Sequence, residues 1–89
     1  MFGDAVLWQV YPNPSPGKFN LIYQLNSGEK LIASLYDAKG SLVKEYRISA
    51  NGFLQKLNID VSANNYASGM YLLQVNAAGN QQSFKLYKQ

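Results

Sequence analysis

The sequence predicts an all-β domain in which two antiparallel sheets pack face to face. Apolar residues recur at every second position along most of the 89-residue chain, as they do in half-buried strands. Turn-forming groups of Asn, Asp, Ser and Gly separate these stretches at intervals of about 8–12 residues, a spacing typical of sandwiches and barrels. No window keeps apolar residues at helical spacing for three turns, so helix is a minor component at most.

Seven segments show the alternation, and the sequence predicts a strand in each: Val6–Tyr11, Lys18–Leu25, Leu31–Tyr36, Leu42–Ile48, Phe53–Asp60, Met70–Asn76 and Gln82–Lys88. Phe19 and Tyr23 would face the core from the second segment, and Phe53 and Ile59 from the fifth. Two packed sheets are the simplest way to bury so many one-sided strands. The predicted fold class is therefore an all-β, antiparallel, immunoglobulin-like β-sandwich of about seven strands.

The connections between these segments carry turn residues. Asp37–Gly40 suits a type I turn, because the Asp carboxylate accepts a nearby backbone amide and Gly adopts positive φ. Asn51-Gly52 is typical of a type I′ hairpin turn. Ser62–Gly69 is long and polar, and we expect it to cross from one sheet to the other.

The most unusual segment is Tyr11-Pro12-Asn13-Pro14-Ser15-Pro16-Gly17, which contains all three prolines of the chain. Proline fixes φ, lacks an amide donor and pushes the preceding residue toward an extended conformation. We therefore expect a rigid bend between the first two strands. Two compatible interpretations stay open: the bend orients these strands, or a partner recognises its surface.

Composition argues against catalysis. The chain has no cysteine and no histidine, so it lacks the thiolate nucleophile, the commonest general base and the commonest metal ligand. Five carboxylates are spread singly along the chain: Asp4, Glu29, Asp37, Glu45 and Asp60. The sequence contains no nucleophile elbow, phosphate-binding glycine loop or metal-ligand spacing. It predicts a protein that is not an enzyme and has no cofactor or metal site.

Charge and hydropathy argue against two further kinds of partner. The formal net charge of +3 comes from eight scattered cations, and this pattern is not typical of nucleic-acid binding. The apolar stretches are far shorter than the ~20 residues that span a bilayer. No signal peptide is visible, and we interpret Met1–Asp4 as the cut edge of a longer protein.

Four short motifs follow one another in the chain: Tyr11-Pro12-Asn13-Pro14 with Gly17, Tyr36-Asp37 with Gly40, Gly69-Met70-Tyr71, and Lys85-Leu86 with Lys88. In these motifs the sequence resembles the type A C-terminal sorting domain of proteins exported by the type IX secretion system. The resemblance extends from Val10 to Lys88. One departure is local: Tyr66 stands where the family usually has Leu, with extra residues before it.

The resemblance implies a sorting signal rather than an enzyme. It implies a cargo ahead of the domain, folding in the periplasm, and binding by the outer-membrane translocon and by sorting and attachment components. The cargo would then reach the cell surface or the medium, often with removal of the domain or attachment to lipopolysaccharide. Residues 1–9 would be a linker edge with the first strand, and residues 10–89 the sorting domain. Self-association through an edge strand is a further expectation.

The candidate recognition residues are Pro12, Asn13, Pro14, Gly17, Asp37, Gly40, Gly69, Tyr71, Lys85 and Lys88. Each also has a structural interpretation. The first four would form a rigid lead-in and the next two a turn, with calcium binding at Asp37 as a remote alternative. Gly69 would provide a bend, and Tyr71 a buried ring whose hydroxyl bonds to the backbone. Lys85 and Lys88 would be solvated edge charges that discourage aggregation, or contacts for the translocon.

A competing interpretation is an immunoglobulin-like or fibronectin-like accessory module, acting as a spacer, an adhesin or a carbohydrate-binding module of a large extracellular protein. Seven tyrosines and Trp8 support it, because aromatic faces stack on sugar rings. Tyr36, Tyr46 and Tyr87 would either be exposed or pack at the sheet margins, and a contiguous exposed aromatic patch would favour a ligand.

Overall fold

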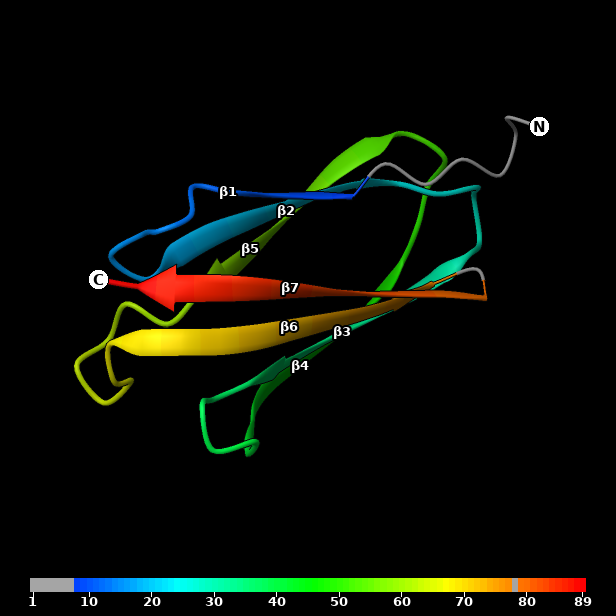
Figure 1. Cartoon of the computed structure of the whole chain (residues 1–89). Helices are drawn as coiled ribbons and strands as arrows, with labels where there is room; N and C mark the ends of the chain where they lie inside the picture. Colours follow the sequence, from blue (N-terminus) through cyan, green and yellow to red (C-terminus); the bar gives the residue numbers. More distant parts are fainter. Residues whose placement is uncertain (1–7, 78) are drawn as a thin grey trace.

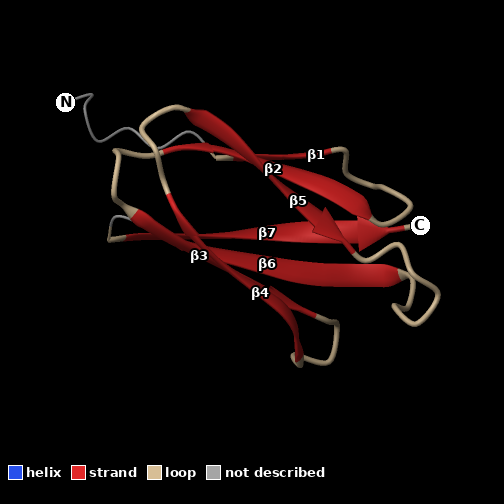
Figure 2. Cartoon of the chain, turned by 180° about the vertical axis from the view of Figure 1, so that it is seen from behind, coloured by secondary structure: helices blue, strands red, loops and turns tan. Residues whose placement is uncertain are grey.

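The computed structural model describes residues 8–77 and 79–89, and these residues form seven strands without a helix. The strands are β1 (Gln9–Tyr11), β2 (Lys18–Gln24), β3 (Lys30–Tyr36), β4 (Leu42–Ser49), β5 (Leu54–Asp60), β6 (Gly69–Ala77) and β7 (Asn80–Lys88). One sheet has the strand order β1-β2-β5, and the other has β4-β3-β6-β7 (Figure 1). The same two layers are visible from behind (Figure 2). The predicted antiparallel, immunoglobulin-like sandwich is confirmed.

From β2 onward, the strand boundaries lie within two residues of those predicted. Residues 6 and 7 of the first predicted strand lie outside the described residues, and β1 begins at Gln9. None of the described residues belongs to a helix that could cross a membrane.

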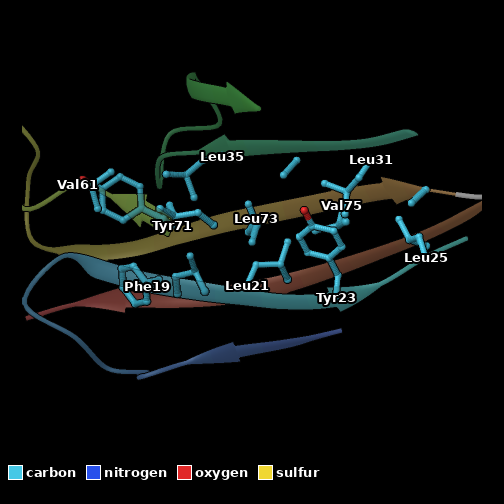
Figure 3. Close-up of a cluster of buried hydrophobic side chains, with 14 of the residues drawn as sticks. Phe19, Leu21, Tyr23, Leu25, Leu31, Leu35, Val61, Tyr71, Leu73 and Val75 are labelled. Carbon is cyan, nitrogen blue, oxygen red and sulfur yellow. The ribbon is translucent and has the colours of Figure 1, made fainter. Parts of the chain in front are cut away.

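The core lies between the two sheets and follows the alternation of the sequence (Figure 3). Its buried members are Phe19, Leu21, Tyr23, Leu25, Leu31, Ala33, Leu35, Ala50, Ile59, Val61, Tyr71, Leu73, Val75, Ala77 and Leu86. The register aligns Leu21 with Leu57 and Phe19 with Ile59 of β5. Apolar side chains of neighbouring strands therefore form one continuous face, and each such cross-strand pair stabilises the sheet.

Phe53 does not face the core, and the prediction is wrong at this position. Its side chain is 73% exposed. The reason is that Phe53 belongs to the turn before β5, where its amide donates to Asn51 Oδ1 at 2.9 Å. The strand itself begins one residue later, at Leu54.

The type I′ hairpin predicted at Asn51-Gly52 is also wrong. β4 pairs with β3 whereas β5 pairs with β2, so this connection crosses between the sheets. It is tied to the β2–β3 crossing by two hydrogen bonds, from the Gly28 amide to the Ala50 carbonyl at 2.9 Å and from the Ala50 amide to the Glu29 carbonyl at 2.8 Å. The crossover predicted at Ser62–Gly69 is confirmed, because it joins β5 to β6 of the other sheet.

Tyr23, buried near the end of β2, makes the stability of the domain sensitive to alkaline pH. Burial raises the pKa of its hydroxyl above the ordinary value of 10.0, because apolar surroundings disfavour the phenolate. The resulting stabilisation is complete below about pH 10 and is lost as the pH rises through the raised pKa. We expect the melting temperature to fall above pH 10, and to fall less steeply in the Tyr23→Phe variant.

Thermal melts followed by circular dichroism at pH values from about 8 to about 11 check this expectation. Tyr11→Phe, at an exposed tyrosine, is the matched control. Equal pH slopes in the Tyr23→Phe variant and the parent would contradict it.

Candidate functional site

All ten candidate residues lie at one end of the sandwich, where β1, β3, β5 and β7 end and β2, β4 and β6 begin (Figure 1, left). We call it the motif end. It consists of residues 12–17, residues 37–41, residues 61–71 and residues 85–89. The motifs are far apart in the sequence, and the strand order brings them together.

Asn13 joins the first motif to the last strand. Its Nδ2 donates to the Lys85 carbonyl at 2.7 Å, and its Oδ1 accepts from the Tyr87 amide at 2.9 Å. The side-chain amide thus presents the donor and acceptor of a peptide unit to the edge of β7. These bonds link residues that are 72 and 74 positions apart, so only the folded chain makes them.

Ser15 extends this pairing, although it was not among the predicted site residues. Its amide donates to the Tyr87 carbonyl at 3.0 Å, and its carbonyl accepts from the Gln89 amide at 2.8 Å. Its buried hydroxyl accepts from the amides of Gly17 at 3.1 Å and Lys18 at 3.0 Å. The order Ser-Pro-Gly was the available sequence signal, because serine hydroxyls often accept amides two or three residues ahead.

Pro12 and Pro14 flank Asn13 on the exposed surface, and both follow cis peptide bonds. A proline has no amide hydrogen, so it cannot donate to a further strand. An open strand edge invites pairing with another chain. The segment therefore leads the chain from the β1 sheet to the β7 edge and covers part of that edge.

Gly17 ends this segment at a position that only glycine fits. Its φ is 136°, and a Cβ there would lie 2.5 Å from Ser62 Cα and 2.8 Å from the Ser62 nitrogen. The Gly17 carbonyl accepts from the Val61 amide at 2.7 Å. The first motif is therefore packed directly against the β5–β6 crossover.

Asp37 and Gly40 form the turn between β3 and β4. Asp37 Oδ1 accepts from the amides of Lys39 and Ser41, both at 2.9 Å. Gly40, with a φ of 89°, donates its amide to the Asp37 carbonyl at 3.0 Å. This geometry is the turn expected from the sequence. Within the described residues, no group of three His, Cys, Asp or Glu side chains lies together.

Gly69 and Tyr71 begin β6. Gly69 has a φ of 128° where the crossover enters the strand. The ring of Tyr71 is buried in the core, and its hydroxyl donates to the Ala67 carbonyl at 2.6 Å. Burial raises the pKa of the Tyr71 hydroxyl. Tyr71 thus fastens the crossover to β6 through a backbone partner, as a buried tyrosine is expected to do.

Lys88 corrects a prediction, because it is not a solvated edge charge. It is only 9% exposed, and its Nζ donates to the carbonyls of Tyr66 at 2.5 Å and Ala63 at 3.2 Å. The alternation of β7 directs Lys88 to the same side as the buried Leu86. There the ammonium meets carbonyl groups of the crossover. Lys85, on the opposite face of the strand, is exposed as predicted.

Polar contacts also fasten the crossover to its neighbours. The Ser62 hydroxyl donates to Asp60 Oδ1 at 2.6 Å and the Ser62 amide does so at 2.9 Å, and these bonds lower the pKa of Asp60 below 3.8. Lys44 Nζ donates to the Asp60 carbonyl at 2.7 Å and lies 5.4 Å from the centre of the Tyr66 ring. Tyr66 stands where the sequence departs from the resembled family. Its ring packs against the core and lies beneath the Lys44 ammonium.

The aromatic residues divide between core and surface. Trp8 and Tyr46 are half-buried and pack against the core, and Tyr36 is half-buried on the outer face of its sheet. Of these four residues, Tyr87 is the exposed one. A groove of about 270 Å³ lies between β3 and β4, away from the motif end, where Leu31 aligns with Ile48. The three tyrosines suspected of binding sugar therefore do not share one exposed surface.

Residues 9–89 match a protein family described as the secretion system C-terminal sorting domain. The matched range contains every described strand and all ten candidate residues. No curated protein matches the chain.

Proposed function

Because this chain belongs to the family of type IX secretion system C-terminal sorting domains, we propose that it carries a preceding cargo to the outer-membrane translocon. A domain of this family is a sorting signal for export through the outer membrane to the cell surface or the extracellular space. In the finer proposal, translocon and attachment components bind the folded motif end, with residues 10–89 as the sorting domain and no catalytic step.

The observation that carries this proposal is the pairing of Asn13 with β7. Asn13 bonds to the backbone of Lys85 and Tyr87, which are 72 and 74 positions away in the sequence. A partner that binds this surface would therefore distinguish a folded domain from an unfolded or truncated one. The signal would be read after folding in the periplasm rather than from a linear peptide.

The direction of β1 also supports the proposal. Gln9 pairs with Ile22 and Tyr11 with Asn20, so β1 runs toward the motif end. A cargo that precedes β1 would join the domain from the other direction. The motif end would then stay accessible while the cargo remains attached.

The accessory-module interpretation predicts the same sandwich but does not account for the motifs. A spacer needs only a stable fold and two connections. The family of this chain is defined by sorting, and the four motifs of the chain lie at one end of the sandwich. The sorting proposal explains both facts.

A fusion experiment tests the proposed function. Residues 1–89 are attached to the C-terminus of a reporter that has an inner-membrane export signal, in cells with and without a type IX system. We expect the reporter on the cell surface or in the medium only in cells that have the system. A folded fusion that stays in the periplasm of those cells would contradict the proposal.

The Asn13→Asp variant then tests whether the secretion machinery recognises the assembled motif end. The carboxylate cannot donate to the Lys85 carbonyl, so this bond should be lost and residues 12–14 should be held less firmly against β7, while the side-chain size is retained. A loss of about 1.4 kcal/mol in binding free energy weakens the binding of a partner about tenfold, and we expect export to fall with it. Circular dichroism must show that the sandwich is intact, and unchanged export would contradict recognition of this segment.

A further inference from the structure

The outer face of the four-stranded sheet carries an apolar patch next to the first motif. The registers place Leu42, Tyr36, Leu72 and Lys85 in one row across the four strands, and Met70 beside Tyr87 in the next row. Three of these apolar side chains are well exposed: Leu42 by 54%, Met70 by 37% and Tyr87 by 45%. We call these six residues the outer patch.

The apolar character of this face stops abruptly. The row beyond the patch consists of Glu45, Ser34, Gln74 and Ser83, all polar. The patch is therefore confined to the motif end, where Asn13 bonds to the backbone of Lys85 and Tyr87. Exposed apolar residues scattered singly need no explanation, but residues gathered in one place mark an interaction surface.

Lys85 is the one charged residue of the patch. No partner of the Lys85 ammonium occurs among the described residues, as neither a hydrogen bond nor an ion pair holds it. Two carboxylates adjoin the patch, Asp37 directly after Tyr36 and Glu45 in the next row, and both are engaged: Asp37 Oδ1 accepts two turn amides, and Glu45 Oε1 lies 3.4 Å from Arg47 Nη2. The patch thus offers apolar and aromatic contact area with one unpaired cation at its border.

We propose that the outer patch is the docking surface for a protein component of the secretion machinery, which brings apolar side chains and a carboxylate. The apolar side chains would cover Met70 and Tyr87, and the carboxylate would pair with Lys85. Interfaces concentrate their affinity in a few aromatic and apolar residues, and complementary charges at the border select the partner. This inference rests on the proposed function, because it names the partner's chemistry.

Two other occupants fit this surface less well. A second copy docked face to face would offer Lys85 no unengaged carboxylate from Asp37 or Glu45. An anionic membrane surface is bound by clusters of about 4–8 basic residues, whereas Lys85 is the one basic residue of the patch. An acidic and apolar protein surface fits both the contact area and the charge.

Export of the reporter fusion tests the proposal with matched variants. Met70→Ser combined with Tyr87→Ser should lower export about tenfold or more, as expected for central interface residues. Phe53→Ser combined with Leu54→Ser is the control, because these side chains are at least as exposed but lie at the opposite end. Lys85→Glu should also lower export, and Lys56→Glu, at an exposed position on β5, should not.

Melting temperatures of the purified domains show whether each variant folds, and only folded variants are compared. If the parent fusion is not exported, the proposed function itself fails. If the parent is exported and folded patch variants are exported equally well, only the docking inference fails.

Photocrosslinking identifies the occupant. Tyr87→p-benzoylphenylalanine in the fusion should give an adduct with an outer-membrane protein of the secretion system, identified by mass spectrometry. The same replacement at Phe53 should not give this adduct. An adduct with lipopolysaccharide alone, an adduct between two fusion molecules, or no adduct from an exported fusion would each overturn the proposal.

Discussion

Gly17→Ala is expected to lower the free energy of unfolding by about 3 kcal/mol or more. A non-glycine residue at a φ of 136° is strained, which costs about 1–3 kcal/mol. The added Cβ would also lie 2.5 Å from Ser62 Cα, and a backbone atom cannot move aside as a flexible side chain can. Forcing extra volume into a packed site costs about 1–3 kcal/mol more.

Urea denaturation and thermal melts measure this effect, and a loss of about 3 kcal/mol corresponds to a fall of roughly 12–24 °C in Tm. Gly40→Ala is the matched control, because Gly40 also has a positive φ, 89°, but no atom lies within 4 Å of the added Cβ. It should cost only the strain, about 1–2 kcal/mol. Equal losses in the two variants would show that contact with Ser62 does not matter.

Lys88→Met is expected to cost about 2 kcal/mol. The ammonium donates to the carbonyls of Tyr66 and Ala63, and hydrogen bonds to charged groups contribute about 1.5–3 kcal/mol. Methionine keeps the apolar stem of the side chain and removes only the donor. The crossover should then open more easily, and its amide hydrogens should exchange faster with solvent.

Lys85→Met is the control for this prediction, because it removes an exposed lysine from the same strand. A surface substitution of this kind usually changes stability by less than about 0.5 kcal/mol. Denaturant midpoints give the difference, and hydrogen exchange at residues 61–68 locates it. The role assigned to Lys88 would be wrong if both variants unfolded at the same urea concentration.

The strands were predictable because their signal is local. Along β2 the alternation of buried and exposed residues is visible in the sequence itself, and each strand formed close to its predicted position. The errors arose where pairing mattered. Asn51-Gly52 is typical of a hairpin, but β4 and β5 belong to different sheets, and nothing in a two-residue turn reveals which strands will be neighbours.

The sequence predicted which residues belong to the candidate site, but it did not predict how they lie in space. The residue types and positions of Gly17 and Asp37 indicate a turn conformation of the backbone. The pairing of Ser15 with Tyr87 and the contact of Lys88 with Tyr66 have no such local signal, because these partners lie 72 and 22 positions away. A lysine near the end of an edge strand suggests a solvated charge until the crossover loop is known to approach it.

The amino-acid order alone determined that this protein is a sandwich of half-buried strands and carries the motifs of an export address. These properties follow from side-chain periodicity and from residue types with restricted backbone angles, both of which are short-range. Only the tertiary structure decided that the motifs share one end, that Asn13 acts as a peptide unit on β7, and that Tyr87 and Met70 stay uncovered. Those facts depend on which strands pair and in what register, and burial of the whole core selects that pairing.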